Sequence, residues 1–127
     1  MNKPFIISFF FALVTFIVLG GLFGNFVFLP EFATWHEAYP DAVRETPDFV
    51  SGFILGLLQL IAFVVLLPKL QITSGSGAAL FGAVYSVVIW LIVDLQMVSV
   101  TNIVSYEYVL KDALLSAVMG AILGVVV

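Results

Sequence analysis

Two aspartates placed inside apolar segments are the residues of this chain with the clearest capacity for chemistry. Asp94 lies in the run "VIWLIVDLQMVSV", residues 88–100, and Asp112 lies near the start of the last apolar run. An ionisable side chain is costly inside a membrane, so its presence indicates either a functional site or an ion pair. The elements that carry these two carboxyl groups therefore decide what they can do.

Each aspartate belongs to a row of residues spaced by four, and such a row shares one face of a helix. The rows are Asp112, Ser116, Gly120 and Gly124 in one segment and Gly82, Ser86, Trp90 and Asp94 in another. If the two helices run antiparallel, a rise of about 1.5 Å per residue places Asp94 at the depth of Asp112. Two carboxyl groups at one depth can share a proton or hold a cation between them.

A structural ion pair is the alternative role for Asp94. Lys111 can neutralise it across the hairpin, or can pair with Glu107 four residues earlier in its own helix. Gln96 then extends toward the membrane interface or hydrogen bonds to Asn102. Intramembrane charges are usually paired, which favours the structural role, but both alternatives stay open at this point.

The composition indicates an integral membrane protein. Of the 127 residues, 63% are hydrophobic and only 9% are charged, whereas about a quarter are charged in ordinary soluble domains. A hydrocarbon core of about 30 Å requires about 20 residues of helix. Four apolar stretches are of this length, at residues 5–29, 49–67, 77–100 and 106–127. We therefore predict a single all-α domain over residues 1–127, an up-down-up-down four-helix membrane bundle.

The segment between the first two spans, "PEFATWHEAYPDAVRETP", is the longest connection. Phe32, Trp35 and Tyr39 recur at helical spacing, which predicts a short helix lying in the membrane interface. Trp35 and His36 on this helix could form an outer lid above the carboxyl groups. Thr46, which precedes a proline, is expected to cap the second span.

Small residues four positions apart allow the backbones of membrane helices to approach closely. Such pairs are Gly20 and Gly24, Gly52 and Gly56, Ala78 and Gly82, and Gly120 and Gly124, one pair in each span. The first two pairs lie in the outer half of the membrane and the last two in the inner half. We expect the first two helices to contact closely in the outer half, and the last two in the inner half.

The basic residues predict the orientation, because Lys and Arg are enriched in cytoplasmic connections. Lys3 and Lys69 fall on one side of the membrane, whereas Arg44 lies in the long first connection among several acidic residues. This distribution predicts that both termini are cytoplasmic.

The layout of the chain also resembles a known group of proteins. It combines a glycine-bearing first helix, a long tryptophan-containing outer connection, a glycine-rich start of the third helix and a last helix of the form "YVLKDALLSAVMGAILG". In these features it is similar to small uncharacterised bacterial four-helix integral membrane proteins, a domain of unknown function. The resemblance implies the bacterial cytoplasmic membrane and no particular activity.

Function is indicated less directly. The chain has no cysteine and one histidine, and it has no nucleophile-base pair and no phosphate-binding loop, so we expect no enzyme, metal or cofactor. The acidic outer connection argues against a nucleic-acid partner. The first hypothesis is a scaffold or accessory subunit in the lipid bilayer that packs against itself or other membrane proteins. The second is an oligomeric transporter or channel component that uses Asp94 and Asp112 for a proton or cation. The third is a binder of a hydrophobic ligand or a membrane enzyme.

Overall fold

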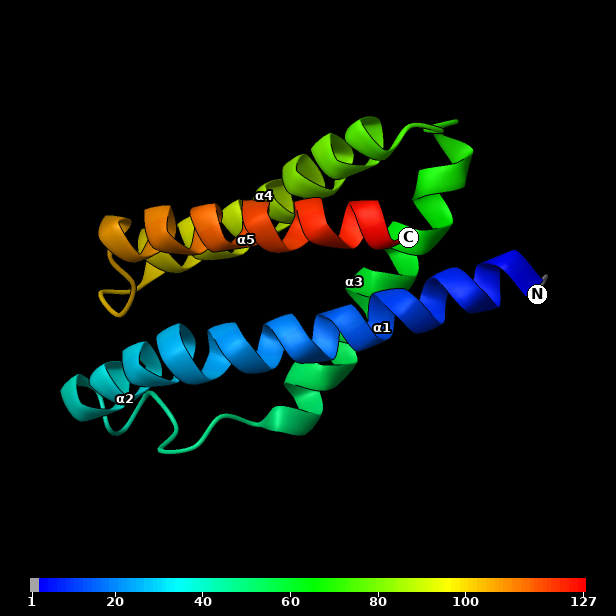
Figure 1. Ribbon diagram of the computed structural model, residues 1–127. Coiled ribbons are helices and arrows are strands. Elements are labelled where there is room, and N and C mark those ends of the chain that lie inside the picture. Colours follow the sequence, from blue (N-terminus) through cyan, green and yellow to red (C-terminus); the bar gives the residue numbers. More distant parts are fainter. Residues whose placement is uncertain (1–2) are drawn as a thin grey trace.

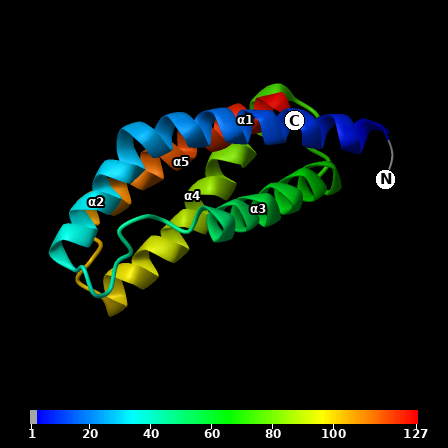
Figure 2. The ribbon, with the colours of Figure 1, turned by 90° about the horizontal axis from the view of Figure 1, so that it is seen from below.

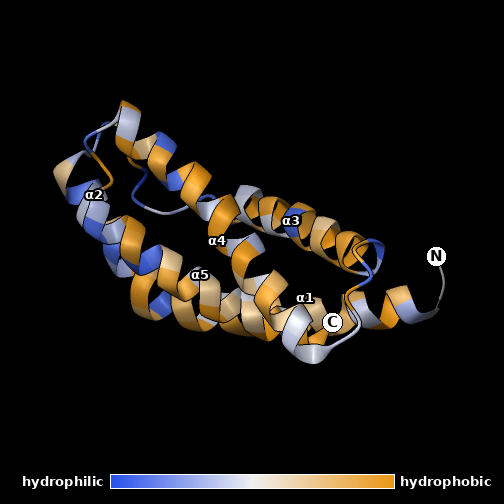
Figure 3. Cartoon of the chain, turned by 90° about the horizontal axis from the view of Figure 1, so that it is seen from above, coloured by the Kyte–Doolittle hydropathy of each residue, from blue (hydrophilic) through white to orange (hydrophobic). Residues whose placement is uncertain are grey.

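The computed structural model describes residues 3–127, and its regular elements are helices. They are α1 (Lys3–Phe23), the π-helical turn η1 (Gly24–Phe28), α2 (Leu29–Ala38), α3 (Phe49–Lys69), α4 (Gly75–Val100) and α5 (Tyr106–Val126). Four helical segments are long and apolar enough to cross a membrane, which confirms the predicted all-α membrane class. Hydrophobic residues cover the middle of the helices, and hydrophilic residues gather on α2 and the connections (Figure 3).

The first membrane helix continues well beyond the predicted end of its span at residue 29. It runs through η1 into α2 and ends at Ala38, so the segment predicted as a separate interfacial helix is a continuation of α1. In the wide turn, the N–H of Leu29 donates to the carbonyl of Gly24 five residues back. Pro30 follows directly, and its ring would clash with the carbonyl of Phe26 in a regular helix. The widened turn relieves this clash and lets the helix continue.

The four spans pack as a bundle in which α4 and α5 form the most extensive pairing. These two helices lie side by side along their length (Figure 1). Helix α1 contacts both α3 and α5, and α3 makes its smaller contact with α4. The start of α1 and the end of α5 lie at the same end of the bundle (Figures 1 and 2).

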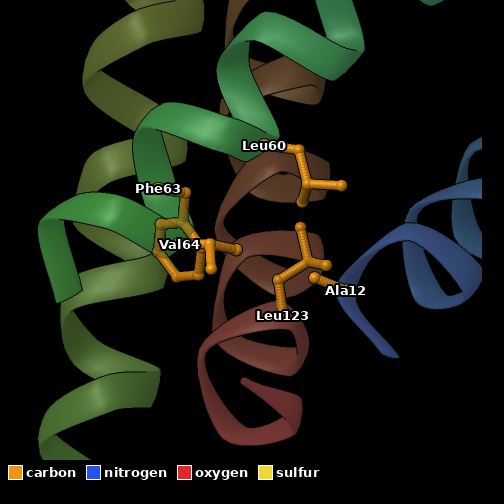
Figure 4. Close-up of a cluster of buried hydrophobic side chains, with 5 residues drawn as sticks. All are labelled: Ala12, Leu60, Phe63, Val64 and Leu123. Atoms are coloured by element: carbon orange, nitrogen blue, oxygen red, sulfur yellow. The ribbon is translucent and has the colours of Figure 1, made fainter. Parts of the chain in front are cut away.

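The main cluster of buried apolar side chains lies toward the end of the bundle where α1 begins. Its buried side chains come from α1, α3 and α5 and point toward one another (Figure 4): Ala12, Leu60, Phe63, Val64 and Leu123. The ring of Phe63 stacks on Phe81 with centroids 5.6 Å apart. Lipid is as apolar as these side chains, so close packing rather than transfer out of water stabilises this cluster.

Asp48, and not Thr46, caps α3. Its Oδ1 accepts hydrogen bonds from the N–H groups of Val50 at 3.1 Å and Ser51 at 3.3 Å, and the Ser51 hydroxyl donates to Oδ2 at 2.7 Å. Thr46 was the wrong choice because Asp48 has the extended backbone of a cap, with ψ at 92°, and the helix starts only at the next residue.

This cap predicts a pH effect on stability. Hydrogen bonds from the Ser51 hydroxyl and N–H lower the pKa of Asp48 from its ordinary value of 3.8. A carboxyl group with a lowered folded-state pKa contributes stability above its unfolded pKa and loses this contribution as the pH falls through the folded pKa. We expect the thermal midpoint of the wild type to exceed that of Asp48→Asn above about pH 5, and the difference to close well below the ordinary pKa.

Circular-dichroism melts of both proteins in one detergent, across this pH range, measure the difference. Asparagine is a suitable control because it also caps helices but carries no charge. A difference that stays constant with pH would contradict the assignment of Asp48 as a charged cap.

Candidate binding site inside the bundle

The seam between α4 and α5 is built from the small residues of the two four-residue rows. A Cβ added to Gly82 would overlap the carbonyl oxygen of Gly120, and a Cβ added to Gly120 would overlap that of Gly82. A Cβ on Gly124 would likewise overlap the carbonyl of Ala78. The structure thus brings together Ala78, Gly82, Gly120 and Gly124, the small residues predicted for these helices. Their lack of side chains lets the two backbones touch.

This close seam places the two intramembrane carboxyl groups together. Asp94 and Asp112 are buried, with 6% and 4% of their surfaces exposed, and their carboxyl groups lie close enough to interact directly. Asp112 also accepts a hydrogen bond from the hydroxyl of Ser116, one turn along α5. Within the described part of the chain, Oδ2 of Asp94 has no hydrogen-bond partner. Two carboxyl groups this close can share a proton.

The ion pair of Lys111 is with Glu31 of α2. The structure therefore does not bring Lys111 to Asp94, which was the ion-pair alternative from the sequence. Glu107 acts on Lys111 only as a more distant charge, and Gln96 is exposed on α4. Glu31 lies 80 residues from Lys111 in the chain, so no local spacing could have indicated this partner.

Aromatic contacts reinforce the junction of α2 with α5. The ring of Trp35 meets that of Tyr108 edge to face, with centroids 4.7 Å apart, and Phe32 contacts Trp35 in the same way at 6.4 Å. His36 points elsewhere: its Nδ1 lies 2.7 Å from the carbonyl of Val43 and donates to it, which holds the connection after α2. Of the two residues predicted as an outer lid, Trp35 covers the interior and His36 anchors a loop.

A cavity of about 710 Å³ opens between α1, α3, α4 and α5, on the side of the core nearest α2. Most of its wall is apolar and aromatic, with side chains that include Phe16, Phe23, Phe28, Phe32, Leu55 and Phe63. Trp35 and Trp90, the two tryptophans of the sequence, also line it. Its volume lies within the range of about 300 to 1,000 Å³ that is usual for small-molecule sites.

One wall of the cavity is polar, where α4 and α5 face α3. The polar side chains there are Gln59, Tyr85, Ser86, Tyr108, Asp112 and Ser116. The hydroxyl of Tyr85 donates to the backbone carbonyl of Gln59 at 3.1 Å. Asp112 thus borders the cavity. Asp94 does not line the cavity but lies against Asp112 from α4. The rows spaced by four indicated Ser86, Asp112 and Ser116, whereas Tyr85, beside Ser86 in the sequence, was missed.

The glycine pairs of the first two spans surround this cavity instead of closing a helix contact. Among the described residues, no atom lies within 4 Å of a Cβ placed on Gly20, Gly24 or Gly52, and all three line the cavity. Gly56 differs, because a Cβ there would overlap the ring of Phe16. Phenylalanine side chains hold α1 away from α3 here, so the small residues leave space where close contact was expected.

Comparison with known proteins adds no assignment: no protein family, curated protein or solved structure matches this chain. The resemblance to small uncharacterised bacterial four-helix membrane proteins stays a prediction. Within residues 3–127, the structure shows no group of three or more His, Cys, Asp or Glu side chains that could hold a metal ion.

Proposed function

We propose that this membrane protein binds a lipophilic molecule with a polar end in the cavity inside its helix bundle. The cavity itself is the observation that carries the proposal. Ligand sites are usually apolar hollows with a few convergent polar groups that orient the ligand, and this cavity combines a wall rich in phenylalanine with one polar wall around Asp112 and Ser116.

The glycines that line the cavity allow a direct test. Because space is open around Gly52, Gly52→Leu is expected to fill the cavity without displacing its neighbours. Both tryptophans face the cavity, so a brominated ligand bound there quenches their fluorescence. We expect a brominated long-chain alcohol to quench the wild type saturably in lipid nanodiscs, and Gly52→Leu to lose at least most of this saturable part.

Val18→Phe serves as the matched control, because Val18 is 54% exposed on α1 and does not line the cavity. It adds a larger side chain on the lipid-facing surface and should keep the saturable quenching. Quenching that rises in proportion to the alcohol content, and equally in all three proteins, would show that the probe acts only from the lipid and would overturn the proposal.

The scaffold or accessory role predicted from the sequence is a second candidate, supported by the exposure of the first span. Only 6% of its apolar window is buried, against 22% to 33% in the other spans. This face would meet lipid, a second copy or another membrane protein. Gentle solubilisation and native mass measurement test this role, and a lone monomer would count against it.

We also propose a direction for the four spans and a membrane in which they lie. The positions of Lys3 and Lys69 support cytoplasmic termini for an up-down-up-down bundle, and the resemblance to small bacterial membrane proteins supports the bacterial cytoplasmic membrane. In this orientation α2 and the carboxyl pair lie toward the outer side, and α2 carries the interfacial aromatic residues. Use of the pair for proton or cation transport is a further alternative, which needs flux measurements in proteoliposomes.

A further inference from the structure

The cavity presents a negative group with no positive partner. Asp112 is the acidic residue in its wall, and no Lys, Arg or His among the described residues lines it. The basic residues whose side chains are described lie elsewhere: Lys111 pairs with Glu31, His36 binds the Val43 carbonyl, and Arg44 and Lys69 are exposed. The side chains that the structure describes therefore place no cation beside the carboxyl pair.

The closeness of the two carboxyl groups lets them share one proton. Two carboxyl groups that share one proton carry one negative charge between them. Such a charge is costly in apolar surroundings unless a cation or several donors compensate it. Ser116 donates one hydrogen bond to Asp112, and Oδ2 of Asp94 remains without a partner within the described residues. A ligand that brings a positive charge would complete this site.

The walls indicate what kind of cation fits. A small metal ion needs several oxygen ligands, and the structure shows no group of three suitable side chains in the part of the chain that it describes. Aromatic rings, in contrast, stabilise organic cations over their faces, and quaternary ammonium groups are bound in this way. Trp35, Trp90, Tyr85 and Tyr108 line the cavity together with Asp112.

Resting on the proposed function, we infer that the ligand is a lipophilic organic cation, with its positive group beside Asp112 and its hydrocarbon part against the phenylalanine wall formed by α1 and α3. The site thereby combines charge neutralisation, cation-π contact and apolar packing in one cavity. A neutral lipid of equal length keeps only the last of these contributions.

Protons compete with such a cation for Asp112, so binding of the cation should weaken as the pH falls. The titratable group beside both carboxyl groups is Tyr108 on α5, which also interacts with Glu31 on α2, and Glu31 is held by Lys111. Helix α3 contributes one polar side chain to the cavity wall, the neutral Gln59, and no charged side chain. The carboxyl pair itself is thus the group expected to respond to pH in this site.

Three brominated probes of one chain length test the inference: an alkyl trimethylammonium, the alcohol and an alkyl sulfonate. In nanodiscs of neutral lipid, the wild type should bind the ammonium probe about tenfold more tightly than the alcohol, and the sulfonate least. Asp112→Asn should bind the alcohol as the wild type does and lose the preference for the ammonium probe. Glu107→Gln is the matched control, since it neutralises an exposed carboxylate of the same helix that does not line the cavity and should keep the preference.

The outcomes separate the two proposals. Saturable binding of the alcohol without a preference for the ammonium probe would overturn the cation inference and leave the proposed function standing. Failure of every probe to bind saturably would remove both. If Asp112→Asn does not fold, the pH dependence in the wild type decides: the ammonium affinity must fall on acidification while the alcohol affinity stays constant, and any other pattern contradicts the inference.

Discussion

Gly120→Ala is expected to lower the free energy of unfolding by about 2 to 3 kcal/mol, at the upper end of the usual cost of overpacking. The added Cβ would overlap the carbonyl oxygen of Gly82 and would lie 2.5 Å from Oγ of Ser86. A backbone carbonyl cannot turn aside as a flexible side chain can, so α4 and α5 must separate. Reversible unfolding in mixed micelles, followed by circular dichroism, measures the change.

Gly20→Ala is the control for this prediction. It makes the same chemical change within a membrane helix, but space is open around a Cβ at this position. Alanine is also the better helix former, so the stability should stay equal or rise slightly. Equal stability of Gly120→Ala and wild type would mean that Gly120 does not lie against the carbonyl of Gly82.

The pairing of α4 with α5 could be predicted because the two rows of residues spaced by four indicate both where the backbones approach and at which depth the polar groups meet. Gly82 and Gly120 indicate where the backbones approach, and Asp94 and Asp112 indicate the depth at which the polar groups meet. The connection between these helices is short, which leaves few alternatives to an antiparallel hairpin. Local pattern and short connection together determine the geometry.

The cavity could not be predicted, because the four-residue spacing of small residues does not distinguish glycines at a helix contact from glycines that border open space. Gly20 and Gly52 belong to pairs spaced like those of α4 and α5, yet they border open space. The ring of Phe16 on α1 lies against Gly56 of α3, and the rotamer of such a side chain cannot be read from spacing. The Lys111–Glu31 pair was hidden for a related reason, because it joins segments that are adjacent only after folding.

The outer end of the first helix shows how a local signal can mislead. Proline favours the first position of a helix, so Pro30 by itself indicates a new helix after the first span. In the structure the preceding turn widens into η1, and the helix passes through Pro30 without ending. As a result, α2 reaches α5, and Trp35 contacts Tyr108 at the border of the cavity.

Asp94→Val is expected to destabilise the protein by about 1 to 3 kcal/mol, the cost of leaving a buried polar group without its partner. The substitution removes the Asp94 carboxyl group from beside Asp112. The remaining side-chain partner of the Asp112 carboxyl group is then Ser116. Asp94→Asn should cost less, since its amide can donate to the Asp112 carboxylate. Both variants are compared with the wild type by the unfolding measurement described for Gly120→Ala.

The double variant Asp94→Val with Asp112→Val distinguishes a role in stability from a role in binding. Removing both carboxyl groups leaves neither one buried without its partner, so the combined cost should fall below the sum of the single costs by about 1 kcal/mol or more. A sum that is simply additive would mean that the two groups do not interact. A double variant that is nearly as stable as the wild type, but has lost the preference for the ammonium probe, would mean that the carboxyl pair serves the ligand rather than the fold.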